Sequence, residues 1–196
     1  IPIVGLLIFI ALAFYVINQV RVGGPVHQQL KAIDDLKADI LPPPLYAVDA
    51  FAAVNAAFVA TSTSDFELRD KKLEEVTKAE AAFNKQVEYW KKNIHTDTMG
   101  GAFQAVIKSN ENFYRIYNKD YVSAIKLGAI AAAKPLGDLT AAYDVNRLTV
   151  NTMVAELEKE STNTVESSNT LLKTILSALA LLGLLILALI WIFGSR

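Results

Sequence analysis

Two apolar segments stand near the two ends of the chain, and a long polar stretch separates them. The first covers about residues 1–20 and the second about residues 174–193. Each is an uncharged run of about 20 residues, which is the length that a helix needs to cross the hydrocarbon core of a bilayer. The pattern therefore predicts two transmembrane helices, with residues 21–173 in water between them.

The first apolar segment differs from a cleavable signal sequence. It is longer than the apolar core of such a signal, and it has neither a basic start nor a small-residue cleavage site. Because the sequence begins at Ile1 rather than at Met, we expect that it is a piece of a longer protein.

The polar stretch is predicted to be helical throughout. Apolar and polar residues do not alternate as they do in strands, and no Asn-Gly or Asp-Gly hairpin turn occurs. Helix boundaries are expected at 61–64, where Ser64 is a candidate N-cap with Glu67 three residues on, at 95–101, and at Gly128, a favoured C-terminal cap. The predicted helices cover 21–60, 65–94, 98–127 and a fourth stretch that starts between 129 and 137 and enters the second apolar segment.

The spacing of apolar residues predicts the fold class: all-α, an antiparallel up-down four-helix bundle continuous with the two transmembrane helices. Apolar residues recur at alternating spacings of three and four, which is typical of left-handed, coiled-coil-like packing. The seam predicted for the third helix comprises Met99, Phe103, Val106, Asn110, Phe113, Tyr117, Asp120, Ala124 and Leu127.

Composition and charge narrow the function classes. The chain has 19 Lys+Arg, 20 Asp+Glu and a net charge of −1 at pH 7, so it lacks the basic balance of a nucleic-acid-binding protein. It has no cysteine, and His27 and His95 have no ligand-spaced partners for a metal. No phosphate-binding loop, HExxH motif or Ser-His-Asp set occurs. We therefore expect no enzyme, no metal and no cofactor.

Four departures from a good helical core are predicted to lie at one level of the bundle. Counted from the loops at its far end, Glu80, Asn110, Asn146 and Pro43 are each about 16 or 17 residues away, or about 25 Å at 1.5 Å per residue. Polar groups in a seam cost stability unless they are paired, so their shared level calls for a reason.

The sharpest departure is the proline run Pro42, Pro43 and Pro44 inside the first predicted helix. Each proline removes an amide donor and clashes with the carbonyl four residues earlier. We expect the helix to break here, which leaves carbonyl groups without helical partners.

Two compatible interpretations of this level remain open. In the first, an internal polar layer fixes the helix register, with Glu80 paired to Arg147 and the two asparagines bonded to each other. In the second, the same groups line a pocket for a small polar ligand such as an amine or an amino acid. The candidate ligand-binding residues are Tyr46, Glu80, Asn110, Tyr114, Tyr143, Asn146 and Arg147.

A secondary candidate lies nearer the far end of the bundle. Asn55 and Arg69 are each about five residues from the predicted loop at 61–64. Arg69 either extends out of the bundle end into solvent or contacts an anion, for example across a dimer interface.

Two segments resemble a known family. Residues 23–46, GGPVHQQLKAIDDLKADILPPPLY, resemble the first helix of many methyl-accepting chemotaxis proteins, in which a G-P-x-x-x-x-I/L segment leads to D-L-x-A-D-I-L-P-P-P-x-Y. Residues 112–147 resemble the matching region of the third and fourth helices, where an F-Y pair, a G-D tip and Y-x-x-H-R are usual. Here Ala129 replaces the acid of the tip, and Asn146 replaces the histidine. The likeness covers most of the polar stretch.

The resemblance implies the periplasmic sensor region of a bacterial chemotaxis receptor. Such a region is a homodimer in the inner (cell) membrane, with its bundle facing the periplasm or exterior, and it binds a small polar ligand or a ligand-binding protein. The signal would reach a cytoplasmic HAMP linker, of which residues 194–196 would be the start, and a cytoplasmic signalling module that this sequence lacks. Two alternatives stay open: the input domain of a sensor histidine kinase or cyclic-dinucleotide enzyme, and a non-sensory structural membrane protein.

Overall fold

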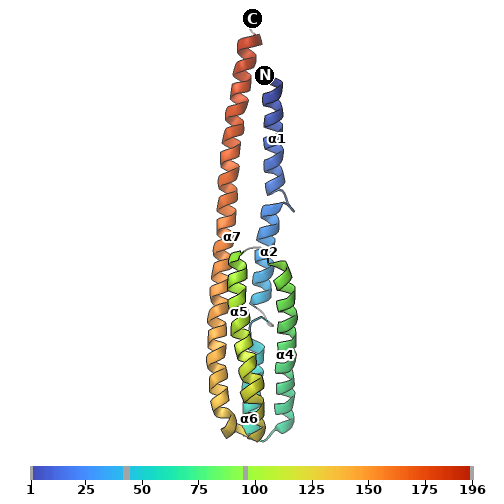
Figure 1. Ribbon diagram of the computed structural model, residues 1–196, viewed down its shortest axis with the longest axis vertical. Helices are drawn as coiled ribbons and strands as arrows, with labels where there is room; N and C mark the ends of the chain where they lie inside the picture. Colours follow the sequence, from blue (N-terminus) through green and yellow to red (C-terminus); the bar gives the residue numbers. More distant parts are fainter. Residues whose placement is uncertain (1, 42–44, 95–96, 195–196) are drawn as a thin grey trace. The chain divides into compact units, whose positions relative to one another are not determined.

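The computed structural model describes residues 2–41, 45–94 and 97–194, and within these residues every regular element is a helix (Figure 1). The predicted all-α class is confirmed. The proline run Pro42, Pro43 and Pro44 lies outside the described residues. The elements are α1 (Pro2–Val20), α2 (Pro25–Ile40), α3 (Val48–Ser62), α4 (Phe66–Asn93), α5 (Asp97–Ile116), the π-helical turn η1 (Tyr117–Tyr121), α6 (Val122–Leu127) and α7 (Ala129–Gly194).

The chain forms two compact units. Unit 1 comprises Ile1–Ile33 and Lys159–Arg196, and unit 2 comprises Asp34–Glu158. Helices α2 and α7 each contribute to both units.

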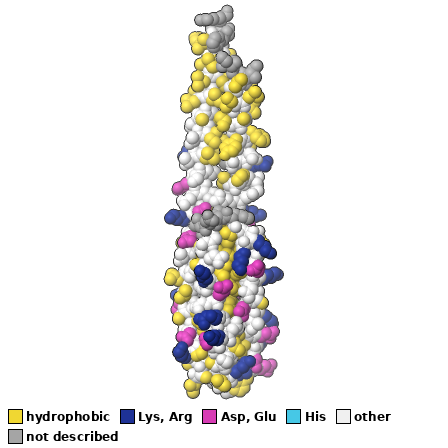
Figure 2. All heavy atoms as spheres, viewed as in Figure 1, with side chains coloured by type: hydrophobic (Ala, Val, Ile, Leu, Met, Phe, Trp, Pro, Cys, Tyr) yellow, Lys and Arg dark blue, Asp and Glu magenta, His cyan; other side chains and the backbone are white. Residues whose placement is uncertain are grey.

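Unit 1 brings α1 beside the C-terminal part of α7 (Figure 1). A Cβ added to Gly5 would lie 3.2 Å from the Ile186 side chain, so the glycine permits a close approach of the two helices. Most outward side chains here are apolar, with Phe14 71% and Trp191 75% exposed. Figure 2 shows hydrophobic side chains gathered over the part of unit 1 that carries the two termini, whereas charged side chains gather over unit 2. An exposed apolar surface of this extent is typical of a site of membrane or protein contact.

One described helix is long and apolar enough to cross a membrane, the stretch Ala129–Ile192 of α7. The apolar part of α1, Val4–Gln19, is shorter than such a span. Length and composition therefore support one membrane-crossing helix, and the predicted span at 1–20 stays a prediction.

The helix is interrupted between α1 and α2, so the single helix predicted over 21–60 is wrong. Gly23 has a φ of 81°, in the region that favours glycine. A Cβ on Gly24 would lie 2.7 Å from the carbonyl oxygen of Asn18, closer than van der Waals contact permits. Pro25 then opens α2, where its missing amide costs nothing. A second interruption separates α2 from α3.

Unit 2 is held by a core of apolar side chains and aromatic rings from all its helices. Helix α3 packs along α4, and α4, α5 and α7 run alongside one another with alternating directions (Figure 1). Two buried tyrosines tie the helices together, because the Tyr117 hydroxyl donates to the Leu73 carbonyl at 2.9 Å and the Tyr121 hydroxyl donates to the Val54 carbonyl at 2.8 Å. Other fully buried side chains are Leu36, Ile40, Val76, Phe103, Val106, Phe113, Ile125, Leu139 and Val150.

The N-cap of α4 is Asp65, so the prediction of Ser64 is wrong. The Asp65 carboxylate accepts a hydrogen bond from the Leu68 amide at 3.0 Å, as a good N-cap does. Ser64 precedes it with a φ of 61°. The predicted stop at Gly128 is confirmed, because this glycine ends α6 with a φ of 130°.

The π-helical turn η1 shifts the buried seam of the third helical stretch by one residue. A π turn holds one more residue than an α turn. Tyr121 and Ile125 are fully buried, whereas the predicted seam residues Asp120 and Leu127 are exposed and Ala124 is only half-buried. The predicted seam is therefore correct as far as Tyr117 and wrong beyond it.

Candidate functional site

Two buried asparagines hold the backbone that reconnects α2 with α3. The Nδ2 of Asn110, on α5, donates to the Leu45 carbonyl at 2.8 Å. The Oδ1 of Asn146, on α7, accepts the Ala47 amide at 3.2 Å. Both asparagines have no exposed surface. Buried backbone groups outside a helix need such partners, so these side chains stabilise the non-helical segment at 45–47.

The two asparagines do not bond each other, so the predicted direct bond is wrong; they are linked through Ser109 and the Val106 carbonyl, which also accepts a hydrogen bond from the Asn110 Nδ2 at 3.2 Å. The Nδ2 of Asn146 donates to the Ser109 hydroxyl at 3.0 Å, and that hydroxyl donates to the Val106 carbonyl at 2.8 Å. The Oδ1 of Asn110 is buried and has no hydrogen-bond donor among the described residues. An unpaired buried acceptor costs about 1–3 kcal/mol.

An aromatic stack borders this layer. The rings of Tyr46 and Tyr143 are parallel, with centroids 6.0 Å apart, and Phe51 stacks on Tyr143 at 4.2 Å. The two hydroxyl oxygens lie 3.2 Å apart. Desolvation, followed by the hydrogen bond with Tyr143, raises the pKa of Tyr46 to about 12. The raised pKa keeps the Tyr46 hydroxyl protonated at neutral pH.

The structure separates Arg147 from the buried layer, and the predicted ion pair with Glu80 is wrong. Arg147 is exposed and pairs with Asp144, one turn earlier on α7, at 3.3 Å. Position 147 follows the buried Asn146, and one residue along a helix turns a side chain by about 100°. The guanidinium consequently points away from the layer.

Glu80 belongs to a different cluster. Its two carboxylate oxygens accept hydrogen bonds from the Asn118 Nδ2 at 3.0 and 3.1 Å. Desolvation, followed by the charge of Glu80, raises the pKa of the buried Tyr114. Four of the seven candidate ligand-binding residues therefore meet at the segment 45–47. Tyr46 belongs to this segment, and Asn110, Tyr143 and Asn146 lie beside it.

The buried tyrosines predict a loss of stability in alkali. Burial raises the pKa of Tyr117 from 10.0 to about 12; a hydrogen bond with Thr77 opposes this rise, and the charge of Glu80 adds to it. A raised folded-state pKa means that the stabilising contribution is complete below pH 10 and is lost as the pH rises through 12. We expect the melting temperature, followed by circular dichroism, to fall between pH 10 and 12, and Tyr117→Phe to reduce this fall. The exposed Tyr89→Phe is the matched control, and an equal effect of both substitutions would contradict the assignment.

The secondary candidates Asn55 and Arg69 are satisfied locally. The Arg69 side chain is only 13% exposed, donates from Nε to Asp70 at 2.8 Å and lies 5.0 Å over the Phe66 ring. It does not extend freely into solvent. The Nδ2 of Asn55 donates to the Phe51 carbonyl one turn earlier. Neither residue points to a ligand.

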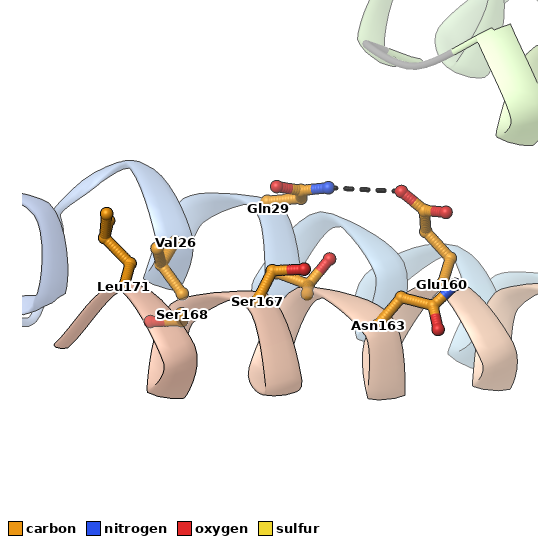
Figure 3. Close-up of a pocket in the computed structure, with 8 residues that line it drawn as sticks. Val26, Gln29, Glu160, Asn163, Ser167, Ser168 and Leu171 are labelled. Carbon is orange, nitrogen blue, oxygen red and sulfur yellow. Dashed lines mark hydrogen bonds between the residues drawn. The ribbon is translucent and has the colours of Figure 1, made fainter. Parts of the chain in front are cut away.

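A polar groove lies in unit 1, between α2 and α7 (Figure 3). Its volume is about 370 Å³. The Gln29 side chain donates to the Glu160 carboxylate at 3.3 Å across it, the dashed line of Figure 3. The other lining residues are Val26, Asn163, Thr164, Ser167, Ser168 and Leu171. Most of the side chains between α2 and α7 here are small hydroxyl and amide groups rather than large apolar ones. They fill less space, so the two helices are packed loosely.

Further grooves lie among the described residues of unit 2. One of about 540 Å³ separates α3 from α4 and includes Lys72 and Glu75, which pair at 2.8 Å. One of about 370 Å³ borders η1 and α7, and one of about 280 Å³ lies between α2 and α4. Asn110 and Asn146 line none of these grooves. No group of three or more His, Cys, Asp or Glu side chains within residues 2–41, 45–94 and 97–194 could hold a metal ion.

Three residues that contact the candidate residues were not predicted from the sequence: Phe51, Ser109 and Asn118. Ser109 directly precedes a seam asparagine, and a hydroxyl at that flank was a usable signal for a hydrogen bond across the helices. No such signal marks Phe51 and Asn118 in the sequence, because the rotation of their helices in the packed structure decides which residues they contact. The chain matches no family model, no curated protein and no solved structure, so its function has to be inferred from these residues.

Proposed function

We propose that the chain is the ligand-sensing and membrane-anchored part of a transmembrane receptor of the methyl-accepting chemotaxis kind. In this proposal unit 2 is an antiparallel four-helix bundle outside the cell membrane, and α1 and the end of α7 both cross the bilayer. The chain acts as a homodimer and controls a cytoplasmic signalling module. A sensor for a histidine kinase or a cyclic-dinucleotide enzyme would share every step up to that module.

The observation that carries the proposal is the continuity of α7. This single helix, Ala129–Gly194, includes the buried Asn146 and the apolar segment that is long enough to span a membrane. Asn146 in turn holds the Ala47 amide beside the interrupted helix. A change in the buried layer therefore has an unbroken helix through which to act on the membrane segment.

The chemistry of the layer favours a small ligand with a hydrogen-bond donor. The Oδ1 of Asn110, which has no donor among the residues that the structure describes, is an acceptor that a ligand N–H or O–H group would satisfy. The hydroxyl groups of Tyr46 and Tyr143 are partners for its other polar atoms. Because the segment at 45–47 is not helical, it can move aside with less loss of backbone hydrogen bonding than a helix. An amine or an amino acid meets these requirements.

Signalling then follows from unequal binding to two states. A ligand that binds one arrangement of the buried layer more tightly than another shifts their populations. Helix α7 would slide or rotate by about 1–2 Å between the two states, as interface helices do in other switches. A non-sensory structural role would leave the output unchanged by any ligand.

A chimeric receptor tests the proposal. The chain is joined after Arg196 to the cytoplasmic half of a chemotaxis receptor, and kinase output is recorded while amines and amino acids are titrated. We expect a saturable response, and we expect Asn110→Leu, which removes the free acceptor, to raise the half-maximal concentration at least tenfold, equivalent to about 1.4 kcal/mol. The exposed Asn151→Leu on α7 is the matched control.

The same chimera reports its own orientation. Because the chain has no cysteine, a single Glu74→Cys substitution on α4 provides a unique thiol. An impermeant maleimide added outside the cell should label it. Labelling only after the membrane is opened, or identical responses of the Asn110 and Asn151 variants, would overturn the proposed function.

A further inference from the structure

A small groove between α2 and α4 combines carboxylates with aromatic rings. It lies in unit 2 and has a volume of about 280 Å³. Helix α2 lines it with two acidic side chains one turn apart, and α4 lines it with an amide and two rings. The lining residues are Asp35, Ala38, Asp39, Gln86, Tyr89 and Trp90.

The Asp39 carboxylate is fixed in place by neutral donors. Its Oδ2 accepts hydrogen bonds from the Gln86 Nε2 and from the Trp90 Nε1, the latter at 3.0 Å. Among the described residues, no cationic side chain pairs with Asp39 and no donor reaches its Oδ1. Neutral donors orient a carboxylate without cancelling its charge, so the negative charge of Asp39 stays available to a cation.

Asp35 adds a second negative charge on the same face of α2. The two aspartates are four residues apart, which places them as neighbours on the helix surface, and like charges at this spacing destabilise a helix. No ion pair of Asp35 is found among the described residues. A cation between the two carboxylates would relieve their repulsion.

Two aromatic rings complete the groove. Trp90 is 3% exposed, and its ring meets the Tyr89 ring edge-on, at 87° with centroids 5.2 Å apart. The Tyr89 side chain is 54% exposed, so its ring is open to a ligand. A ring face near a carboxylate is the arrangement that recognises ammonium groups through cation–π attraction.

We propose that this groove binds a small organic cation, such as a primary to quaternary ammonium compound. A divalent metal ion fits less well, because it prefers six or more oxygen ligands and no group of three acidic or histidine side chains occurs within the described residues. The volume lies just below the ~300 Å³ at which pockets for drug-sized ligands begin, so the ligand is small. The inference uses none of the residues of the Asn110 and Asn146 layer, and it holds whether or not the chain is a receptor.

Tryptophan fluorescence of the full chain tests the proposal. The chain has two tryptophans, so Trp191→Phe leaves Trp90 as the only indole. The probe is choline, titrated into the protein in lipid nanodiscs, with 3,3-dimethylbutan-1-ol as its uncharged isostere. We expect a saturable change in Trp90 emission with choline and none with the isostere.

Variants of the lining residues decide the geometry. We expect Tyr89→Ala to weaken choline binding about two- to fivefold, which corresponds to the loss of one cation–π contact. Asp35→Asn and Asp39→Asn should each weaken it at least as much. The exposed Asp34→Asn, next to the groove but not lining it, is the matched control and should bind as the parent does. Asp35 is exposed, so its variant stays informative if Asp39→Asn fails to fold.

Three results would overturn the inference. They are the absence of a saturable change with choline, equal binding of the uncharged isostere, and equal affinities of the Asp34 and Asp35 variants. A failed chimeric receptor response combined with choline binding would reject the proposed function and keep this site.

Discussion

Deletion of Lys108 is expected to unfold unit 2, whereas deletion of Lys119 is expected to leave it folded. Both lysines are exposed and lie on the same helical stretch, so the two deletions remove the same side chain and the same charge. Lys108 lies in the regular α5, and removing one residue there rotates one side of the helix by about 100° relative to the other. That rotation would take buried residues such as Phe103 and Val106 out of the core.

The two deletions differ because Lys119 lies within the π turn. After its removal, Tyr121 follows Tyr117 by three residues and Ile125 follows Tyr121 by four. That is the spacing of an uninterrupted seam, so both side chains can stay in the core while the turn becomes α-helical. We expect a change of about 1 kcal/mol or less, against a loss of more than about 5 kcal/mol for the Lys108 deletion, which is comparable with the whole stability of a domain.

Thermal unfolding of the full chain in detergent, followed by circular dichroism, distinguishes these outcomes. The Lys119 deletion should melt cooperatively near the parent temperature, and the Lys108 deletion should show no cooperative transition of unit 2. If the Lys119 deletion is as damaging as the Lys108 deletion, the π turn does not explain the shifted seam.

Replacement of Asn146 by alanine is expected to cost about 3 kcal/mol, more than replacement of Asn110. The first change leaves the buried Ala47 amide without its acceptor, removes the bond to Ser109 and opens a small cavity. The second removes the donor of the Leu45 carbonyl and the longer bond to the Val106 carbonyl, and it also removes the buried Oδ1, which has no donor among the described residues. We expect about 1–2 kcal/mol for Asn110→Ala.

The melting temperature again provides the measurement. For a chain of this size, about 1 kcal/mol corresponds to 2–4 °C, so Asn146→Ala should lower it by about 6–12 °C. The exposed Asn151→Ala on the same helix should change it by no more than about 1 °C. A larger effect at Asn110 than at Asn146 would show that Asn146 does not support the segment at 45–47.

The sequence predicted the helices and the seam wherever apolar spacing alone decides the packing. Phe103, Val106 and Phe113 are buried as expected, because a spacing of three and four leaves one face of a helix apolar. It did not predict the π turn, since that turn depends on where the Tyr117 and Tyr121 hydroxyl groups find carbonyl acceptors on other helices. Such acceptors are set by the packed structure and leave no mark on local spacing.

The polar layer was predicted only in part, again because the packed structure decides some of its contacts. Counting residues placed Asn110 and Asn146 at the level of the proline run, and the structure brings both to the adjacent segment at 45–47. Counting residues gives the level of a side chain along the helix axis, however, and not the direction in which it points around that axis. It paired Glu80 with Arg147, although a residue directly after a seam position faces outward. That rotation follows from the helix period and was available from the sequence.

The two ends of the chain are attached to unit 2 in mechanically different ways. On the N-terminal side, the chain forms three separate helices, α1, α2 and α3. The glycines at 23–24 separate the first two, and the non-helical segment at 45–47 precedes the third. If α3 rotated, changes in the backbone dihedral angles at these interruptions would take up the rotation before it reached α1. Helix α7 has no such interruption between Asn146 and Trp191, so its backbone hydrogen bonds continue from the buried layer into the apolar segment. Signal transmission of the proposed kind would therefore run along α7, and α1 would only anchor the chain.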